Sequence, residues 1–73
     1  MRIVLTKREQ NLLAAKAIPF DPNQDYSDDD ALELLDLVRE AEVSYSQGED
    51  CTSRELYYQY ARLGDKIYDL IPD

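Results

Sequence analysis

Three short segments of this 73-residue sequence carry the residue pattern that begins an α-helix. Each places a hydroxyl side chain first and an acidic residue three positions later, at Thr6–Glu9, Ser27–Asp30 and Thr52–Glu55. The hydroxyl accepts a hydrogen bond from the amide of the third residue, and a long acid accepts one from the cap amide in return. Each pattern opens a segment with apolar residues at helical spacing. We therefore predict an all-α, three-helix bundle with helices at about 7–17, 28–46 and 53–70.

Proline and glycine set the predicted helix ends. The residue before Pro19 resists helical backbone, so the first helix should end just before it. Gly48 is expected to take the left-handed conformation that closes the second helix. Thr52 is expected to cap the third helix, with Cys51 packing on Leu56 as a hydrophobic staple. Residues 1–5 are predicted to form an extended arm packed on the helices.

The chain is short enough for one domain, over residues 1–73. Short connections favour antiparallel neighbours, so the second and third helices should form a hairpin with the first across it. On the second helix the expected core positions are Ala31, Leu34, Val38, Ala41 and Tyr45. On the third they are Leu56, Tyr60, Leu63, Ile67, Leu70 and Ile71.

The residue inventory excludes several classes of function. The chain has no histidine and a single cysteine, so histidine-based catalysis and thiolate zinc sites are ruled out. We predict a non-enzymatic protein with no catalytic residue, no metal ligand and no cofactor. The net charge of -8 argues against direct nucleic-acid binding. No segment resembles a signal peptide or a membrane span, and the lone cysteine fits a cytoplasmic location.

The negative charge is concentrated in one part of the chain. Residues 1–20 hold four basic residues and one acid, whereas residues 21–50 hold eleven acids and one basic residue. A dense negative face can steer a basic partner protein and compete with nucleic acid for it. Its candidate residues are Asp29, Glu33, Asp36 and Glu40. The alternative is that these acids only keep a small protein soluble.

The tyrosines suggest a second candidate surface. Four of the six lie on the predicted third helix, and Tyr57, Tyr58 and Tyr68 fall outside its core stripe. Tyrosine is favoured at interfaces because it combines a large apolar area with a polar tip. The alternative is that Tyr57 and Tyr68 cover the first helix or the arm.

We therefore expect a small protein-interaction module, a regulator, inhibitor or accessory subunit that binds a protein partner through its acidic face or its tyrosines. One alternative is self-association into a homo-oligomer, since the apolar face of the third helix spans half its circumference. Another is a weak divalent-metal site in the 21–29 loop, which opens with the D-x-N-x-D spacing of a calcium loop. That loop has Tyr26 where the calcium motif needs glycine and Leu32 where it needs glutamate.

Overall fold

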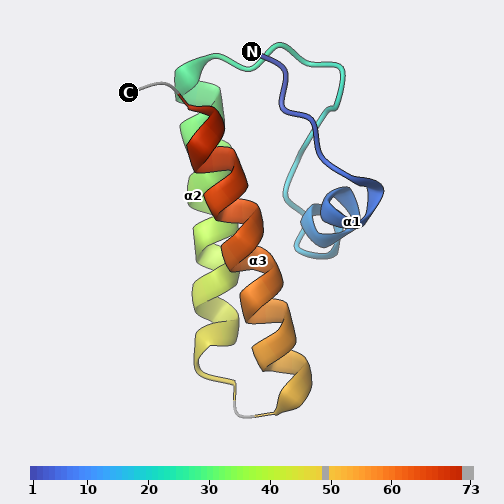
Figure 1. Ribbon diagram of the computed structural model, residues 1–73, viewed down its shortest axis with the longest axis vertical. Helices are drawn as coiled ribbons and strands as arrows, with labels where there is room; N and C mark the ends of the chain where they lie inside the picture. Colours follow the sequence, from blue (N-terminus) through green and yellow to red (C-terminus); the bar gives the residue numbers. More distant parts are fainter. Residues whose placement is uncertain (49, 72–73) are drawn as a thin grey trace.

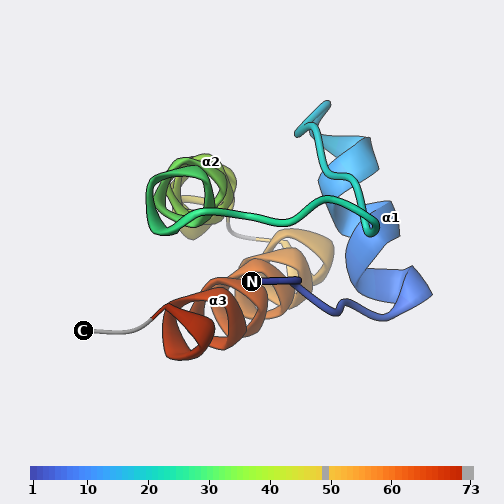
Figure 2. The same ribbon diagram turned by 90° about the horizontal axis from the view of Figure 1, so that it is seen from above.

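The computed structural model describes residues 1–48 and 50–71 (Figure 1). It contains α1 (Lys7–Ala15), α2 (Asp28–Ser46) and α3 (Cys51–Leu70), and the described residues include no strand. α2 and α3 lie side by side as an antiparallel pair, and α1 lies across them next to α3 (Figures 1 and 2). The predicted all-α, three-helix fold is confirmed.

The first two helices begin where the cap patterns place them. The Oγ1 of Thr6 accepts from the amide of Glu9 at 3.2 Å, and the Glu9 carboxylate accepts from the amide of Thr6 at 2.8 Å. Ser27 caps α2 by accepting from the amide of Asp30 at 3.2 Å. No return bond to the shorter side chain of Asp30 is found among the described residues. Of these two helix starts, only that of α1 has the complete capping box.

The third helix begins two residues earlier than predicted. Asp50 rather than Thr52 is its cap, and the Asp50 carboxylate accepts from the amide of Ser53 at 3.3 Å. Aspartate caps a helix as well as threonine does, and the earlier start adds two residues to α3. The side chain of Cys51 is exposed, so the predicted staple with Leu56 is wrong.

The first helix ends two residues earlier than predicted, and its end is not made by proline alone. Ala17 takes the left-handed conformation, with a φ of 55°. The amide of Ile18 then donates to the carbonyl of Leu13 at 3.0 Å, and the amide of Ala17 donates to Ala14 at 3.1 Å. This is the Schellman arrangement, usually made with glycine, and it turns Ile18 back into the core beside Leu13.

The second helix ends at Ser46 as predicted, but the role predicted for Gly48 is wrong. Gln47 is the C-cap, and the φ of Gly48 is not positive. Gly48 is needed for close approach instead, because a Cβ there would lie 2.2 Å from the Cβ of Ser53. The tight turn between α2 and α3 thus depends on glycine having no side chain at position 48, and not on left-handed backbone.

The core is apolar throughout the described residues. Its buried members are Ile3, Leu5, Leu13, Ile18, Tyr26, Ala31, Leu34, Leu35, Val38, Ala41, Tyr60, Leu63 and Ile67. Leu70, expected in the core, is 41% exposed because it lies in the last turn of α3. Residues 1–6 carry no regular secondary structure, and their extended conformation stays a prediction.

Side-chain contacts attach α1 to the helical pair. The hydroxyl of Tyr60, on α3, donates to the carbonyl of Leu12 at 2.5 Å. The Tyr60 ring stacks on Tyr45 of α2 with centroids 5.6 Å apart, and the ammonium of Lys16 lies 4.4 Å from the centroid of the Tyr45 ring. Burial raises the pKa of Tyr60, so its hydroxyl keeps its proton and remains a donor. Lys66 adds a 2.8 Å ion pair to Glu9.

Replacing Ala17 by glycine should stabilise the protein. Left-handed backbone costs an L-residue about 1–2 kcal/mol, and glycine avoids that cost. Glycine also gives the unfolded chain more conformational entropy, which offsets part of the gain in stability. We expect Ala17→Gly to raise the free energy of unfolding by about 0.5–1 kcal/mol in a urea titration. Ala14→Gly, the same change inside α1, should instead lower it by about 1 kcal/mol. Equal effects of the two variants would contradict the assignment of Ala17 to the left-handed position.

The ion pair between Glu9 and Lys66 should make stability depend on acid. Burial alone would raise the pKa of Glu9, but the hydrogen bonds from Lys66 and Thr6 together lower it below its usual value. The pair therefore stabilises the fold above the ordinary glutamate pKa, and this contribution is lost as the pH falls through the lowered value. Glu9→Gln keeps an acceptor for the Thr6 amide but removes the charge.

We expect urea midpoints of the wild type to fall more than those of Glu9→Gln between about pH 6 and pH 3. Glu33→Gln is the control, because Glu33 makes no ion pair within the described residues. It should follow the wild-type pH dependence. Parallel losses in the wild type and Glu9→Gln would mean that the ion pair contributes nothing.

Candidate docking surface on α2

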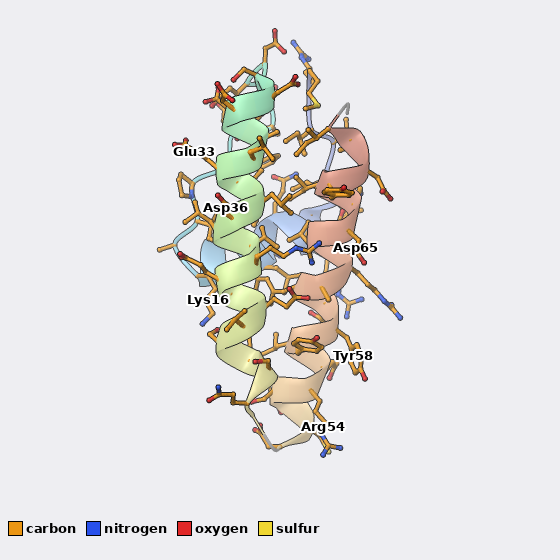
Figure 3. All side chains as sticks on the ribbon, turned by 90° about the vertical axis from the view of Figure 1, so that its left-hand side faces the viewer. Lys16, Glu33, Asp36, Arg54, Tyr58 and Asp65 are labelled. Carbon is orange, nitrogen blue, oxygen red and sulfur yellow. The ribbon has the colours of Figure 1, made fainter. Side chains whose placement is uncertain are left out.

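The four predicted acids form one stripe along the exposed side of α2. At 100° per residue, Asp29, Glu33, Asp36 and Glu40 fall within an arc of about 60°. All four are exposed, and Figure 3 shows Glu33 and Asp36 on the side of α2 that faces away from α3. The buried residues of α2 lie on its opposite side. The structure thus brings the predicted acidic residues together, and we call these four residues the acidic stripe.

No basic residue neutralises this stripe within the described residues. None of its four carboxylates makes an ion pair there. Arg39, the one cation of α2, reaches across to α3 and donates to Asp65 at 3.1 Å. It also donates to Glu42 at 3.3 Å. The bond to Asp65 is the main cause that raises the pKa of Arg39.

Gly64 makes the path of Arg39 across α3 feasible. A Cβ on Gly64 would lie 2.8 Å from an Arg39 guanidinium nitrogen. The arginine therefore lies against the backbone of α3 and turns toward Asp65, and it also lines a hollow with Asp36 and Glu40 at the edge of the acidic stripe. As a result, Arg39 forms its ion pairs with Asp65 and Glu42 and not with the acidic stripe.

Exposed apolar side chains border the stripe on both sides. Leu32 and Val43 lie on one edge, with 45% and 62% of their surface exposed. Leu37 lies on the other edge and lines two adjoining hollows. Exposed aliphatic side chains thus flank the acidic stripe on both of its edges.

One of these hollows is a groove between α2 and the segment that precedes it. Its volume is about 320 Å³, and its lining comes from Pro19, Phe20, Asp21, Gln24, Tyr26, Asp30, Glu33, Leu34 and Leu37. The rings of Phe20 and Tyr26 stack with centroids 5.8 Å apart and planes 12° from parallel. The groove therefore has an aromatic and aliphatic floor with carboxylates at its rim.

Hydrogen bonds fix the segment that carries the aromatic pair. The hydroxyl of Tyr26 accepts from the amide of Asp21 at 3.0 Å. The backbone of Tyr26 exchanges two hydrogen bonds with Met1, at 2.6 and 2.8 Å. The terminal ammonium of Met1 also pairs with Asp25, and this hydrogen bond is the main cause that lowers the pKa of Asp25. The aromatic side of the groove is thus held in place.

The predicted tyrosine surface lies elsewhere and is divided. Tyr57 is half-buried and meets Tyr58 edge-on, with ring centroids 5.5 Å apart. Tyr58 is 63% exposed and lies on the α3 side of the hairpin (Figure 3). Tyr68 is also exposed but lies ten residues further along α3, about 15 Å by helical rise. The three tyrosines therefore do not form a single patch, and they do not adjoin the acidic stripe.

The two alternatives from sequence gain no support here. Among the described residues, no three acidic or cysteine side chains gather closely enough to hold a metal ion. In the 21–29 loop, one oxygen of Asp21 accepts from the amide of Asn23 at 2.9 Å, which is a turn contact. α2 covers one part of the wide apolar face of α3, and α1 meets another part at Tyr60. Self-association stays a prediction.

Comparison with protein-family models, with curated proteins and with solved structures finds no match for this chain. None of the helices in the described part of the chain has the length and apolar character that crossing a membrane requires.

Sequence reasoning missed the groove. Phe20 and Tyr26 were not candidates, because the turn-forming residues between 18 and 26 are typical of a connecting loop. A signal was present, since two aromatic residues six positions apart are unusual in a segment of prolines and aspartates. Aromatic side chains in such a loop indicate that it folds back onto a helix and packs there.

The acidic stripe should be dispensable for folding. Asp36 and Glu40 are like charges four residues apart, which costs an exposed helix about 0.2–0.5 kcal/mol. We expect Asp36→Asn combined with Glu40→Gln to leave the free energy of unfolding unchanged or raise it by up to about 0.5 kcal/mol. Glu42→Gln, on the same helix but paired with Arg39, should lower it by about 0.5 kcal/mol. Loss of stability in the double variant would assign the stripe a structural role.

Proposed function

We propose that this protein is a non-enzymatic interaction module that docks a basic protein partner on the acidic stripe of α2. The observation that carries the proposal is the alignment of four carboxylates without an ion-pair partner within the described residues. Other acids have a structural partner: Glu9, Glu42 and Asp65 pair with cations, and Asp50 caps α3. The acids of the stripe lie outside those pairs.

Electrostatics and shape both support this role. Negative charge concentrated along a helix of 19 residues raises the local concentration of a positive partner and speeds its association. Charge alone gives little affinity once salt screens it, so a specific complex also needs apolar contact. Leu32, Leu37 and Val43 border the stripe and supply that contact. A regulator, inhibitor or accessory subunit would use such a surface.

The tyrosines of α3 are the weaker candidate for the same role. Tyr58 lines a hollow with Arg8, Glu55, Gln59 and Arg62, where charges of both signs meet. Such a mixed surface shows no strong preference for one sign of partner. The acidic stripe, in contrast, favours a positively charged partner. Variants of each surface separate the two candidates.

The full chain, immobilised at low salt, should retain a basic protein from lysate of the source cells and release it as salt rises. Asp36→Asn with Glu40→Gln should weaken that retention by about tenfold. The matched control is Glu55→Gln with Asp69→Asn, which removes two exposed acids from α3. It has the same net charge as the Asp36→Asn and Glu40→Gln double variant. It should retain the partner to within about twofold of the wild type.

Equal losses in the two double variants would show that only net charge matters, and the proposal would fail. Tyr58→Ala tests the other surface, since Tyr58 is exposed and distant from the stripe. A loss of retention in that variant alone would move the docking site to α3.

A further inference from the structure

We propose that the groove between α2 and the 19–26 segment receives an arginine side chain of the basic partner. This inference rests on the proposed function and adds the chemical identity of the partner's anchor residue. The groove lies beside the acidic stripe, and Glu33 belongs to both. A partner lying along the stripe can therefore place a side chain into the groove while it stays in contact with the stripe.

The floor of the groove fits the apolar part of an arginine. Leu34 and Leu37 offer aliphatic surface, and a long basic side chain packs its methylene stem against such surface while its charged end stays near polar groups. Phe20 is half-buried and contributes its ring to the lining. A cation held near an aromatic ring is attracted by the ring's electrons, and arginine makes this contact more often than lysine.

The rim of the groove fits the charged end. Asp30 and Glu33 line it from α2, and Asp21 lines it from the opposite segment. Asp30 and Glu33 make no ion pair within the described residues, and Asp21 uses one carboxylate oxygen on the amide of Asn23. The planar guanidinium can donate to carboxylates on two sides at once, which the compact ammonium of lysine does less well.

The groove is formed before any partner arrives. Tyr26 is buried, its hydroxyl is bonded to the amide of Asp21, and its backbone is bonded to Met1. The stacked ring of Phe20 is held by Tyr26 in turn. A site that is already ordered binds without the entropy cost of arranging its own side chains, which favours a single inserted residue as an anchor.

The direct test is an NMR titration of the full chain with the peptide acetyl-Ala-Ala-Arg-Ala-Ala-amide. We expect amide shifts centred on Phe20, Tyr26, Leu34 and Leu37, with millimolar affinity. The peptide with citrulline in place of arginine has nearly the same shape without the charge, and it should bind at least about tenfold more weakly. The lysine peptide should bind about threefold more weakly than the arginine peptide.

Two variants locate the binding in the groove. Phe20→Leu keeps apolar volume but removes the aromatic ring, and it should weaken the arginine peptide by about fivefold. Glu33→Gln, at an exposed position without an ion pair in the described residues, should weaken it by a similar factor. Asp36→Asn, on the stripe but outside the groove lining, should change it by less than about twofold and serves as the matched control.

Equal binding of the arginine and citrulline peptides, or shifts that avoid the groove, would overturn the inference. Failure of this inference can be told apart from failure of the proposed function. If Phe20→Leu retains the basic partner as well as the wild type while the Asp36 and Glu40 variant does not, the groove is not the anchor site and the stripe still is. If the stripe variant retains the partner fully, the proposed function fails whatever the peptide does.

Discussion

The face that α2 turns toward α3 determines the rest of this molecule. Ala31 and Val38 are fully buried there, and they meet an α3 face on which Leu63 and Ile67 are buried to the same degree. A chain with a single cysteine has no internal disulfide, so its stability depends on this apolar contact. Because α2 has one side to bury, its acids are left together on the other side. The acidic stripe is thus a direct result of how the helical pair packs.

The positions of the basic residues decide whether that stripe is neutral or charged. Arg39 extends over Gly64 to Asp65, Lys66 pairs with Glu9, and Lys16 lies over the ring of Tyr45. Each of these cations joins two parts of the fold, so each acts as a structural contact. The paired acids belong to the same contacts. What remains on α2 is a set of carboxylates whose mutual repulsion mildly destabilises the fold.

Much of the fold could be predicted from local sequence patterns, and the exceptions have physical causes. The caps at Thr6 and Ser27 follow from side chains close in sequence. The end of α2 at Ser46 was placed correctly, but the left-handed Gly48 predicted to cause it does not occur. The start of α3 was placed wrongly because Thr52 and Glu55 have the spacing of a capping box, whereas Asp50, the stronger cap, is followed by Ser53 at that spacing. The left-handed Ala17 was missed because it depends on burying Ile18 beside Leu13, which is a tertiary effect.

The candidate docking surface was predictable only in part, for the same reason. The acidic stripe follows from helical periodicity, since Asp29, Glu33, Asp36 and Glu40 recur at spacings of three and four. The groove required knowing that Phe20 and Tyr26 fold back against α2, and that contact links a loop to a helix. The tyrosines of α3 were grouped by residue type, whereas the structure separates Tyr68 from Tyr57 and Tyr58 along the helix.

The most direct test of this account is NMR mapping of the complex between the full chain and the basic protein that it retains. We predict that amide shifts follow the exposed side of α2 from Asp29 to Val43 and continue into the groove at Phe20 and Tyr26. Shifts confined to α3 around Tyr58, with α2 unperturbed, would contradict it.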